Sequence, residues 1–403
     1  MSIFSKIQKI ENLSPELKSL YLHKVMRDIA VGMISMFSVI FIFTLGKSLE
    51  FVFWYYFAIC FLFFLFLPLW AKIIRYFSMH KLMAFGNLFY ILYVLSLYLL
   101  AQKQFPLMTL IVFAVFFNIL ARATYWVPYN INLANFIDKH HRGRQLSFLN
   151  IVISLIGIVI PIFSAFIIAK FDFSVLYIIS IAIFFVSFFP IFFIPKTREK
   201  YSFGYFETFK KIFSKKHLHT NLSYFADGFQ DHIGSIMWPI FIFLILKGDF
   251  LNVGIVSAAV VLAVCILRYF IGEAVDLLNK KKMLKIGSFL HSIGWIFKTI
   301  ASTGLHVFFI GVYHDFTRIL FQTPLDVLTF EIAADEGHYI DEFTVMREMA
   351  LNLGRAVVLL IGIILLQFIN LQWLFLLGVA ITLLTALISK DEFFSANRHL
   401  ERL

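Results

Sequence analysis

The chain has 403 residues, of which 61% are hydrophobic and only 15% are charged, and its mean hydropathy is +0.86. A soluble domain carries about 25% charged residues to cover its surface, so this composition excludes a soluble protein and indicates a chain surrounded largely by lipid. The net charge of +11 does not indicate nucleic-acid binding, because the cations cluster in short loops between apolar segments, as expected for a membrane protein.

Residues 1–20 are expected to form a cytoplasmic amphipathic segment. Ile3, Phe4, Ile7 and Ile10 would lie on one helical face, which suits a short helix at the headgroups. Charged residues interrupt any longer apolar stretch there, so the segment is not expected to be a cleavable signal.

Apolar segments long enough to cross a bilayer follow in close succession. A spanning helix needs about 20 apolar residues. The sequence predicts twelve spans, at approximately 21–46, 51–71, 82–101, 107–134, 146–169, 173–194, 222–246, 251–272, 283–303, 306–332, 349–370 and 372–389. The expected fold is therefore an all-α polytopic membrane protein.

The longest loop, 196–220, is basic and divides the chain into two parts. We expect an N-terminal six-helix bundle at 21–195, a cytoplasmic linker at 196–220, a C-terminal six-helix bundle at 221–389 and a cytoplasmic tail at 390–403. The linker is interpreted as lying on anionic lipid.

The distribution of Lys and Arg predicts the orientation. One side of the membrane receives most of them, and cytoplasmic loops carry such an excess. Both termini are therefore expected in the cytoplasm and the protein in the inner (plasma) membrane. The basic side carries Lys72, Arg75, Lys81, Lys139, Arg142, Arg144, the cations between Lys196 and Lys216, and Lys280, Lys281, Lys282 and Lys285.

The two predicted bundles resemble each other at three places, about two hundred residues apart. In each bundle, an arginine precedes a proline by six residues. The loop after the second helix carries polar residues at similar spacing in both bundles, and the fifth helix of each opens with an arginine followed by an asparagine. The pairs are Arg122/Pro128 with Arg318/Pro324, Ala71-x3-Arg75-x5-Lys81 with Gly272-x3-Asp276-x3-Lys280-Lys281, and Arg144/Asn150 with Arg347/Asn352. This order predicts two pseudo-symmetric halves.

The loop Gly272-x3-Asp276-x3-Lys280-Lys281 in the second half resembles the loop signature of the major facilitator superfamily. The stretch Asp138-x3-Arg142-Gly143 in the first half resembles it as well. The resemblance implies alternating access around a midplane site lined mainly by helices one, four, seven and ten. It also implies a conformational latch, for which the matching residues are Gly272, Asp276, Lys280, Lys281 and Arg142. The first-half loop departs from the pattern, because Arg75 stands at the position of the acid.

Ionisable residues near the middle of predicted spans indicate where the chemistry lies. Each charge at the centre of a bilayer costs about 2.5–3.5 kcal/mol, so these groups must pair, become neutral or face water. Asp315 and Arg318, three residues apart on one helix, can form an ion pair. Asp231 can pair with Arg122 across the two bundles.

We expect Asp231, His232 and Asp315 to carry proton coupling, because a carboxylate that gains and loses a cationic partner can take up and release a proton. Each also has a structural interpretation, as an ion pair or a packed histidine. Lys298 is expected to extend toward the outer headgroups, and Arg355 has no assigned partner.

Arg122 suggests the class of substrate. An arginine with amide and aromatic neighbours can hold an anionic or hydroxyl-rich solute. The expected substrate-binding residues are Asn118, Arg122, Tyr125, Trp126, Gln230 and Arg318, and two central arginines favour an organic anion over a neutral sugar. Aromatic helix packing around a paired arginine is the structural alternative.

The predicted function is secondary active transport of a small solute, coupled to a proton gradient and without enzymatic activity. The chain has no nucleotide-binding motif, and Cys60 and Cys265 each lie in an apolar segment without metal-ligand spacing, so neither a cofactor nor a metal is expected. The expected partners are a substrate, a proton or other ion, and lipid, with the protein a monomer. Efflux of amphipathic drugs or lipids, a membrane-embedded lipid-modifying enzyme and a non-transporting sensor are the alternatives.

Overall fold

The structure is a computed structural model, and it describes residues 13–46, 48–74, 76–138, 142–197, 201–276, 279–335 and 340–388. These residues are almost entirely helical, and none of them forms a strand. The prediction of an all-α protein is therefore confirmed. Residues 1–12 of the predicted amphipathic segment and the whole of the predicted cytoplasmic tail lie outside the described residues, and the end of the segment belongs to the first helix.

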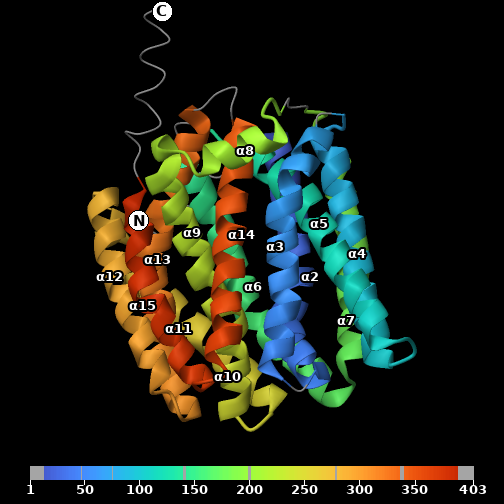
Figure 1. Cartoon of the computed structure of the whole chain (residues 1–403), viewed down its shortest axis with the longest axis vertical. Coiled ribbons are helices and arrows are strands. Elements are labelled where there is room, and N and C mark those ends of the chain that lie inside the picture. Colours follow the sequence, from blue (N-terminus) through green and yellow to red (C-terminus); the bar gives the residue numbers. More distant parts are fainter. Residues whose placement is uncertain are drawn as a thin grey trace, which may run out of the picture.

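The first half of the molecule consists of six helices that run back and forth along its long axis (Figure 1). They are α2 (Pro15–Gly46), α3 (Leu49–Ile74), α4 (Met79–Gln102), α5 (Leu107–Phe136), α6 (Arg142–Lys170) and α7 (Phe173–Ile191).

The linker and the second half follow. The linker contains α8 (Tyr205–Ile212) and the short helix η1 (Lys215–His217). The second half consists of α9 (Leu218–His232), η2 (Ile233–Met237), α10 (Trp238–Ile245), α11 (Phe250–Asp276), α12 (Lys280–Thr299), α13 (Gly304–Asp335), α14 (Ile340–Leu365), η4 (Leu371–Leu376), α15 (Leu377–Leu384) and η5 (Thr385–Leu387).

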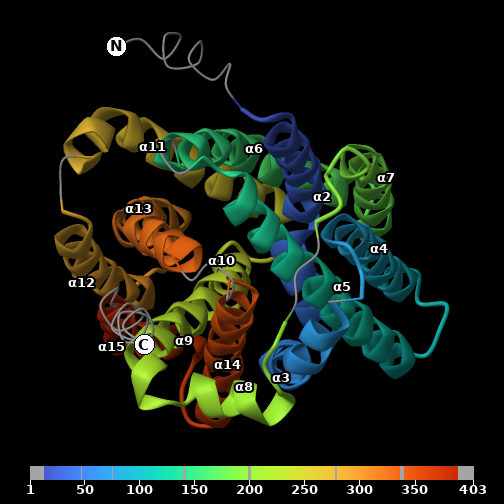
Figure 2. The ribbon, with the colours of Figure 1, turned by 90° about the horizontal axis from the view of Figure 1, so that it is seen from above.

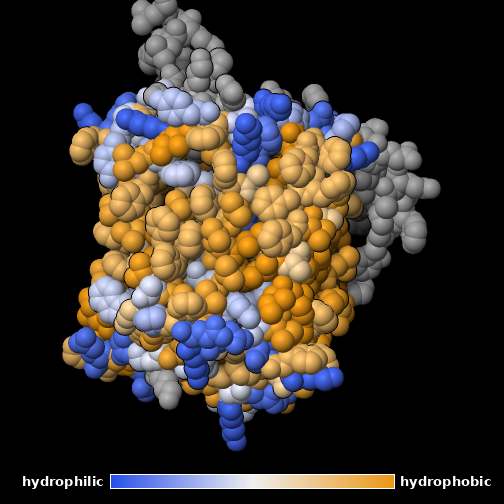
Figure 3. All heavy atoms as spheres, turned by 90° about the vertical axis from the view of Figure 1, so that its right-hand side faces the viewer, coloured by the Kyte–Doolittle hydropathy of each residue, from blue (hydrophilic) through white to orange (hydrophobic). Residues whose placement is uncertain are grey.

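Nine helical segments within the described ranges are long and apolar enough to cross a membrane. The other three predicted spans are helical as well, but each differs from a simple apolar span. The helices α12 and α13 carry ionisable side chains along their length, and residues 371–387 form a shorter apolar helix. The surface agrees with a membrane location, since hydrophobic side chains cover the middle of the visible face and hydrophilic ones gather at its two ends (Figure 3).

The two halves contact each other along two long seams. Seen from above, α6 lies beside α11 and α3 lies beside α14 (Figure 2). We call the end that carries α8 the linker end. At the other end, which we call the loop end, the aromatic rings of Phe37 and Phe173 from the first half pack against Phe250 from the second, with centroids 6.5 and 5.4 Å apart. This aromatic cluster joins the halves at the loop end.

The linker itself is tied to the second half. Glu342, near the start of α14, accepts hydrogen bonds from the backbone N–H (2.8 Å) and hydroxyl (2.5 Å) of Ser202. This contact with α14 fixes the linker across one end of the molecule, where Figure 1 shows α8.

The helix α8 is stabilised at its start by Glu207. The N–H of Gly204, which precedes the helix, and the side chain of Lys211 lower the pKa of the exposed Glu207 carboxyl.

Close helix packing repeats in the two halves. A Cβ at Gly86 of α4 would lie 2.8 Å from the Cβ of Tyr125 in α5, and a Cβ at Gly287 of α12 would lie 2.6 Å from the backbone of Phe321 in α13. These two glycines are about two hundred residues apart, like the repeats in the sequence. The third and fourth helices of each half therefore approach each other through corresponding glycines.

Two further glycines bring α9 and α14 together. A Cβ at Gly228 would lie 2.0 Å from the carbonyl oxygen of Leu351, and a Cβ at Gly354 would lie 2.0 Å from that of Phe225. Real side chains do not reach such distances, so any larger residue must push the two backbones apart. This contact places the residue after Gly354, which is Arg355, next to Asp231 near the end of α9.

Replacing Gly354 with alanine is therefore expected to destabilise the protein. Overpacking of this kind costs about 1–3 kcal/mol, and the unfolding temperature of the detergent-purified protein should fall by several degrees. Gly157→Ala is the matched control, because its new Cβ would make only an ordinary 3.6 Å contact with Val261. Equal unfolding temperatures for the two variants would show that the α9–α14 contact is not tight.

Candidate functional site

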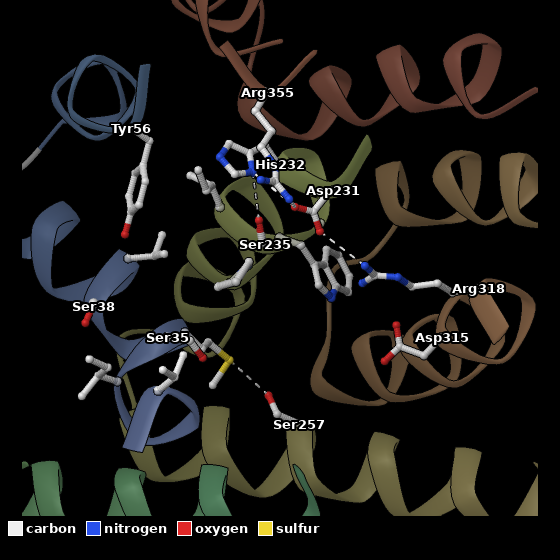
Figure 4. A pocket seen from close by; sticks show the side chains of 18 of the residues that line it. Ser35, Ser38, Tyr56, Asp231, His232, Ser235, Ser257, Asp315, Arg318 and Arg355 are labelled. Atoms are coloured by element: carbon white, nitrogen blue, oxygen red, sulfur yellow. Dashed lines mark hydrogen bonds and ion pairs between the residues drawn. The ribbon is translucent and has the colours of Figure 1, made fainter. Parts of the chain in front are cut away.

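A cavity of about 730 Å³ lies between the two halves. Its walls come from α2, α3, α4 and α5 on one side and from α9 to α14 on the other, and Figure 4 shows part of its lining. Six arginines and lysines and four carboxylic acids of the described residues line it. In an apolar bundle, such a concentration of charge marks a functional site.

The centre of the cavity holds one carboxylate between two guanidinium groups. Asp231 Oδ2 lies 3.1 Å from Nη2 of Arg355, and Oδ1 lies 3.3 Å from Nη2 of Arg318. We call these three residues the Asp231 cluster. Figure 4 shows the two arginines approaching Asp231 from different helices, α14 and α13. The side chain of Arg355 is 18% exposed and that of Arg318 is 47% exposed, so only Arg318 has substantial access to the cavity.

The helix that carries Asp231 changes its geometry directly after the site. Residues Ile233–Met237 form a π-helical turn, and Pro239 follows, which lacks an N–H and whose ring would clash with the preceding turn of a regular α-helix. Wider turns of this kind are frequent at functional sites. Here the wider turn separates α9, which carries Asp231, from α10, which begins with Trp238.

Polar contacts near the cluster connect the two halves. His232 Nε2 lies 3.2 Å from Sγ of Cys60 on α3, and its Nδ1 lies 3.5 Å from Asp231 Oδ2. Arg122 donates a 2.7 Å hydrogen bond to Oδ1 of Asn352 and lies 3.9 Å from the same Cys60 sulfur. A chain of polar groups therefore runs from the Asp231 cluster into the first half.

Most of the site residues expected from sequence line the cavity. The structure places Asn118, Arg122, Trp126, Asp231, His232, Asp315 and Arg318 in its wall. Their common position follows from the central placement of these residues in helices that face the other half.

Two of the expected residues do not line the cavity. Tyr125 is fully buried beside it, and its ring lies 3.6 Å from the guanidinium carbon of Arg27. Gln230 is 3% exposed and faces α15, where its side-chain oxygen accepts a 2.9 Å hydrogen bond from Thr382. Both neighbour a lining residue in sequence, but on a helix the next residue points about 100° away.

The ion pairs also differ from the expectation. Asp231 pairs with Arg355 and Arg318 of its own half, and Arg122 instead binds Asn352. Arg318 reaches across to Asp231 rather than forming the expected pair with Asp315, whose carboxylate lies 3.7 Å from the ring of His314. The tight α9–α14 contact explains the first difference, because it brings Arg355 within reach of Asp231.

Two further charged residues of the cavity wall, Arg27 and Lys298, are not among the site residues expected from sequence. Arg27 is 2% exposed and lies among aromatic rings of α4 and α5. Lys298 does not extend to the headgroups but is 2% exposed and lines the cavity. The signal that could have identified both is the cost of a charge within an apolar helix, which applies to every such residue.

The predicted latch lies mostly beyond what the structure describes. Gly272 and Asp276 belong to α11 and Arg142 begins α6, but the surroundings of these three residues fall outside what the structure describes. Lys280 and Lys281 are exposed at the start of α12, where Asn279 accepts a 3.0 Å hydrogen bond from the Lys281 N–H. The latch stays a prediction.

A helical membrane bundle that encloses a charged cavity between two halves has the architecture of a membrane transporter rather than an enzyme. The sequence profile of the Major Facilitator Superfamily matches residues 25–226, half of the chain. The chain therefore belongs to this superfamily, as the resemblance of its loops implied.

Two known proteins are similar to this chain. The uncharacterized protein YqgE of Bacillus subtilis (strain 168) is 23% identical over 257 residues, which are 59% of this chain and 56% of that protein, so the match spans about half of the relative's length. A crystal structure of the E. coli fucose:proton symporter FucP matches over 93% of this chain and 97% of its own, with a TM-score of 0.62 and 13% identity. The second match shows a shared fold.

Arg355→Met is expected to lower the stability more than Arg318→Met. Removing one partner of a fully buried ion pair costs about 3–5 kcal/mol. The side chains of Arg355 and Asp231 are 18% and 24% exposed, so a smaller loss is expected, and Arg318, at 47%, should matter less than Arg355. The double variant Asp231→Asn/Arg355→Met should lose less stability than the sum of its two single variants, because the paired groups are coupled. Thermal unfolding of the purified variants measures all four values, and strict additivity would contradict the pairing.

Proposed function

We propose that this protein is a secondary active transporter that moves a small organic anion across the inner membrane, coupled to a proton. The observation that carries the proposal is the Asp231 cluster, in which one carboxylate holds two guanidinium groups at the wall of a cavity between the halves. The fold supports transport by alternating access, in which the halves rock about a central site.

The charge of the cavity favours an anionic substrate. Six cationic side chains and four acidic ones line it, and the side chains of Arg318 and Asp315 are each about half exposed there. A guanidinium group binds a carboxylate or phosphate through paired hydrogen bonds. A substrate anion would balance the excess positive charge of the wall.

Protonation of Asp231 supplies a coupling mechanism. A neutral carboxyl group no longer compensates Arg318 and Arg355, so each proton bound adds one positive charge to the cavity and releases Arg318. An anion then binds more tightly, and by linkage the bound anion favours the proton. His232, 3.5 Å from Asp231, is placed to exchange that proton with the group. The two ligands would therefore cross together.

The distribution of Lys and Arg supports an orientation with the linker end in the cytoplasm. In that orientation the aromatic cluster of Phe37, Phe173 and Phe250 closes the outer side of the membrane. Alternating access would require this cluster to separate, because its rings come from different halves.

Asp231→Asn should abolish proton-coupled transport. Asparagine keeps the shape of the side chain but has no carboxylate to protonate. Proteoliposomes loaded with a pH-sensitive dye are exposed to a panel of carboxylate and sugar-phosphate salts. Wild type should acidify the lumen with at least one salt, above the signal of protein-free liposomes, and Asp231→Asn should not.

Asp249→Asn is the matched control. Asp249 is exposed at the loop end and caps α11 through its Oδ1, an acceptor that asparagine retains. This variant should transport as wild type does. Unchanged proton entry in Asp231→Asn would assign the coupling to another residue.

A crosslink between the halves at the loop end should stop transport. In a background with Cys60→Ser and Cys265→Ala, the pair Phe37→Cys/Phe250→Cys is joined by a short thiol-cleavable reagent. The same treatment of Phe41→Cys/Tyr177→Cys, two rings 5.6 Å apart within the first half, should leave transport intact. Reduction should restore the activity of the first pair, and transport by the crosslinked protein would contradict alternating access.

A further inference from the structure

Lys298 occupies an unusual place in the cavity. It lies one residue before the end of α12, is 2% exposed and belongs to the cavity wall. Its Nζ lies 4.4 Å from the ring centroid of Trp295 and 4.6 Å from that of Trp238. The ammonium group therefore rests against two indole rings.

The two indoles are held in fixed positions. The Trp295 N–H donates a 3.0 Å hydrogen bond to Oγ1 of Thr382, and the Trp295 ring packs edge-on against His314 with centroids 4.3 Å apart. Trp238 packs edge-on against Phe375 at 5.6 Å. The rings thus form a preformed surface that stabilises a cation.

Lys298 differs from the arginines of the Asp231 cluster because it has no carboxylate as an ion-pair partner among the described residues. Arg318 and Arg355 share the carboxylate of Asp231, whereas no carboxylate of the described residues forms an ion pair with Lys298. A buried ammonium without an anionic partner is costly, and aromatic faces replace only part of its hydration. Lys298 is therefore a buried cation that lines the cavity and forms no ion pair within the described chain. The carboxylate that acts on it electrostatically is Asp315, whose side chain is 46% exposed in the same wall.

The cavity that Lys298 lines has an apolar stretch as well as charged groups, and Asp315 and Arg318 act electrostatically on Lys298. Pro239 and Ile242 of α10, Val260 of α11, and Val307 and Gly311 of α13 line the same cavity. Val307 and Gly311 lie on one face of α13 with Arg318, at spacings of four and seven residues. Along that face the lining changes from apolar side chains at the loop end to charged ones at the Asp231 cluster.

We propose that Lys298 is the docking point for the carboxylate of the substrate, and that the substrate is an organic acid with an apolar body. The carboxylate would bind the ammonium group on its indole surface, and the hydrocarbon would pack against Val260, Ile242 and Val307. This inference rests on the proposed anion transport and adds a separate role for each charge. Lys298 holds the carboxylate of the anion, while Asp231 carries the proton and the released Arg318 adds its positive charge to the same cavity.

The experiment compares hexanoate with its neutral isostere hexanamide on the purified full-length protein in detergent. Binding is followed by tryptophan emission and by thermal stabilisation, which rises with [L]/Kd. Hexanoate should bind wild type at least tenfold more tightly than hexanamide. In Lys298→Met this preference should vanish, while Lys298→Arg should retain most of it.

Lys285→Met is the matched control, because Lys285 is an exposed lysine of the same helix. It should bind both probes as wild type does. Lys298→Met should be at least as stable as wild type, since it removes an uncompensated charge, whereas a purely structural lysine would lower the unfolding temperature and leave the preference unchanged. Equal binding of hexanoate and hexanamide by wild type would also overturn the proposal.

Equilibrium binding keeps this result separate from the proposed function. If Asp231→Asn loses proton-driven transport but retains hexanoate selectivity, the two roles are distinct as proposed. If wild type binds hexanoate through Lys298 but moves no protons, the docking site stands and the proton coupling fails.

Discussion

The pairing of Asp231 with Arg318 and Arg355 is the interaction on which the arrangement of the second half depends. Isolated charges in an apolar bundle are costly, and a carboxylate between two guanidinium groups lowers the cost of all three, although one net positive charge remains. The contact requires α13 and α14 to stand at fixed rotations beside α9. Gly228 and Gly354 allow this, because they let the backbones of α9 and α14 meet without intervening side chains.

The contacts between the halves are of a different kind. Within the second half, charge compensation and close backbone packing hold the helices together. Between the halves, the described contacts include one hydrogen bond from Arg122 to Asn352, the pair of Cys60 and His232, and aromatic rings at the loop end. None of these contacts is an ion pair, so the halves can separate here without breaking one. The strong contacts within the second half and the weaker contacts between the halves suit two rigid bodies that move relative to each other about the cavity.

The cationic side chains of the cavity differ in how many oxygen acceptors of the protein they contact, and this difference suggests different roles for them. Arg122 and Arg355 have oxygen acceptors within the protein. Arg318 shares its acceptor and remains half exposed, while Lys298 contacts aromatic faces and has no carboxylate of the described residues in an ion pair with it, only the electrostatic influence of Asp315. A ligand gains most where the protein has left a group without its counter-charge, so the least compensated cation is the natural contact for an anion.

The sequence alone determined the helical class, the approximate spans, the central linker and most of the polar residues that face the cavity. These depend on hydropathy over about 20 residues and on single charges in apolar surroundings, which are local properties. Only the tertiary structure decided that Asp231 meets Arg355 rather than Arg122, that Tyr125 and Gln230 face away from the cavity, and that Lys298 turns inward. Each of these depends on the rotation of a helix against its neighbours, and that rotation is set by packing between distant segments rather than by any local pattern.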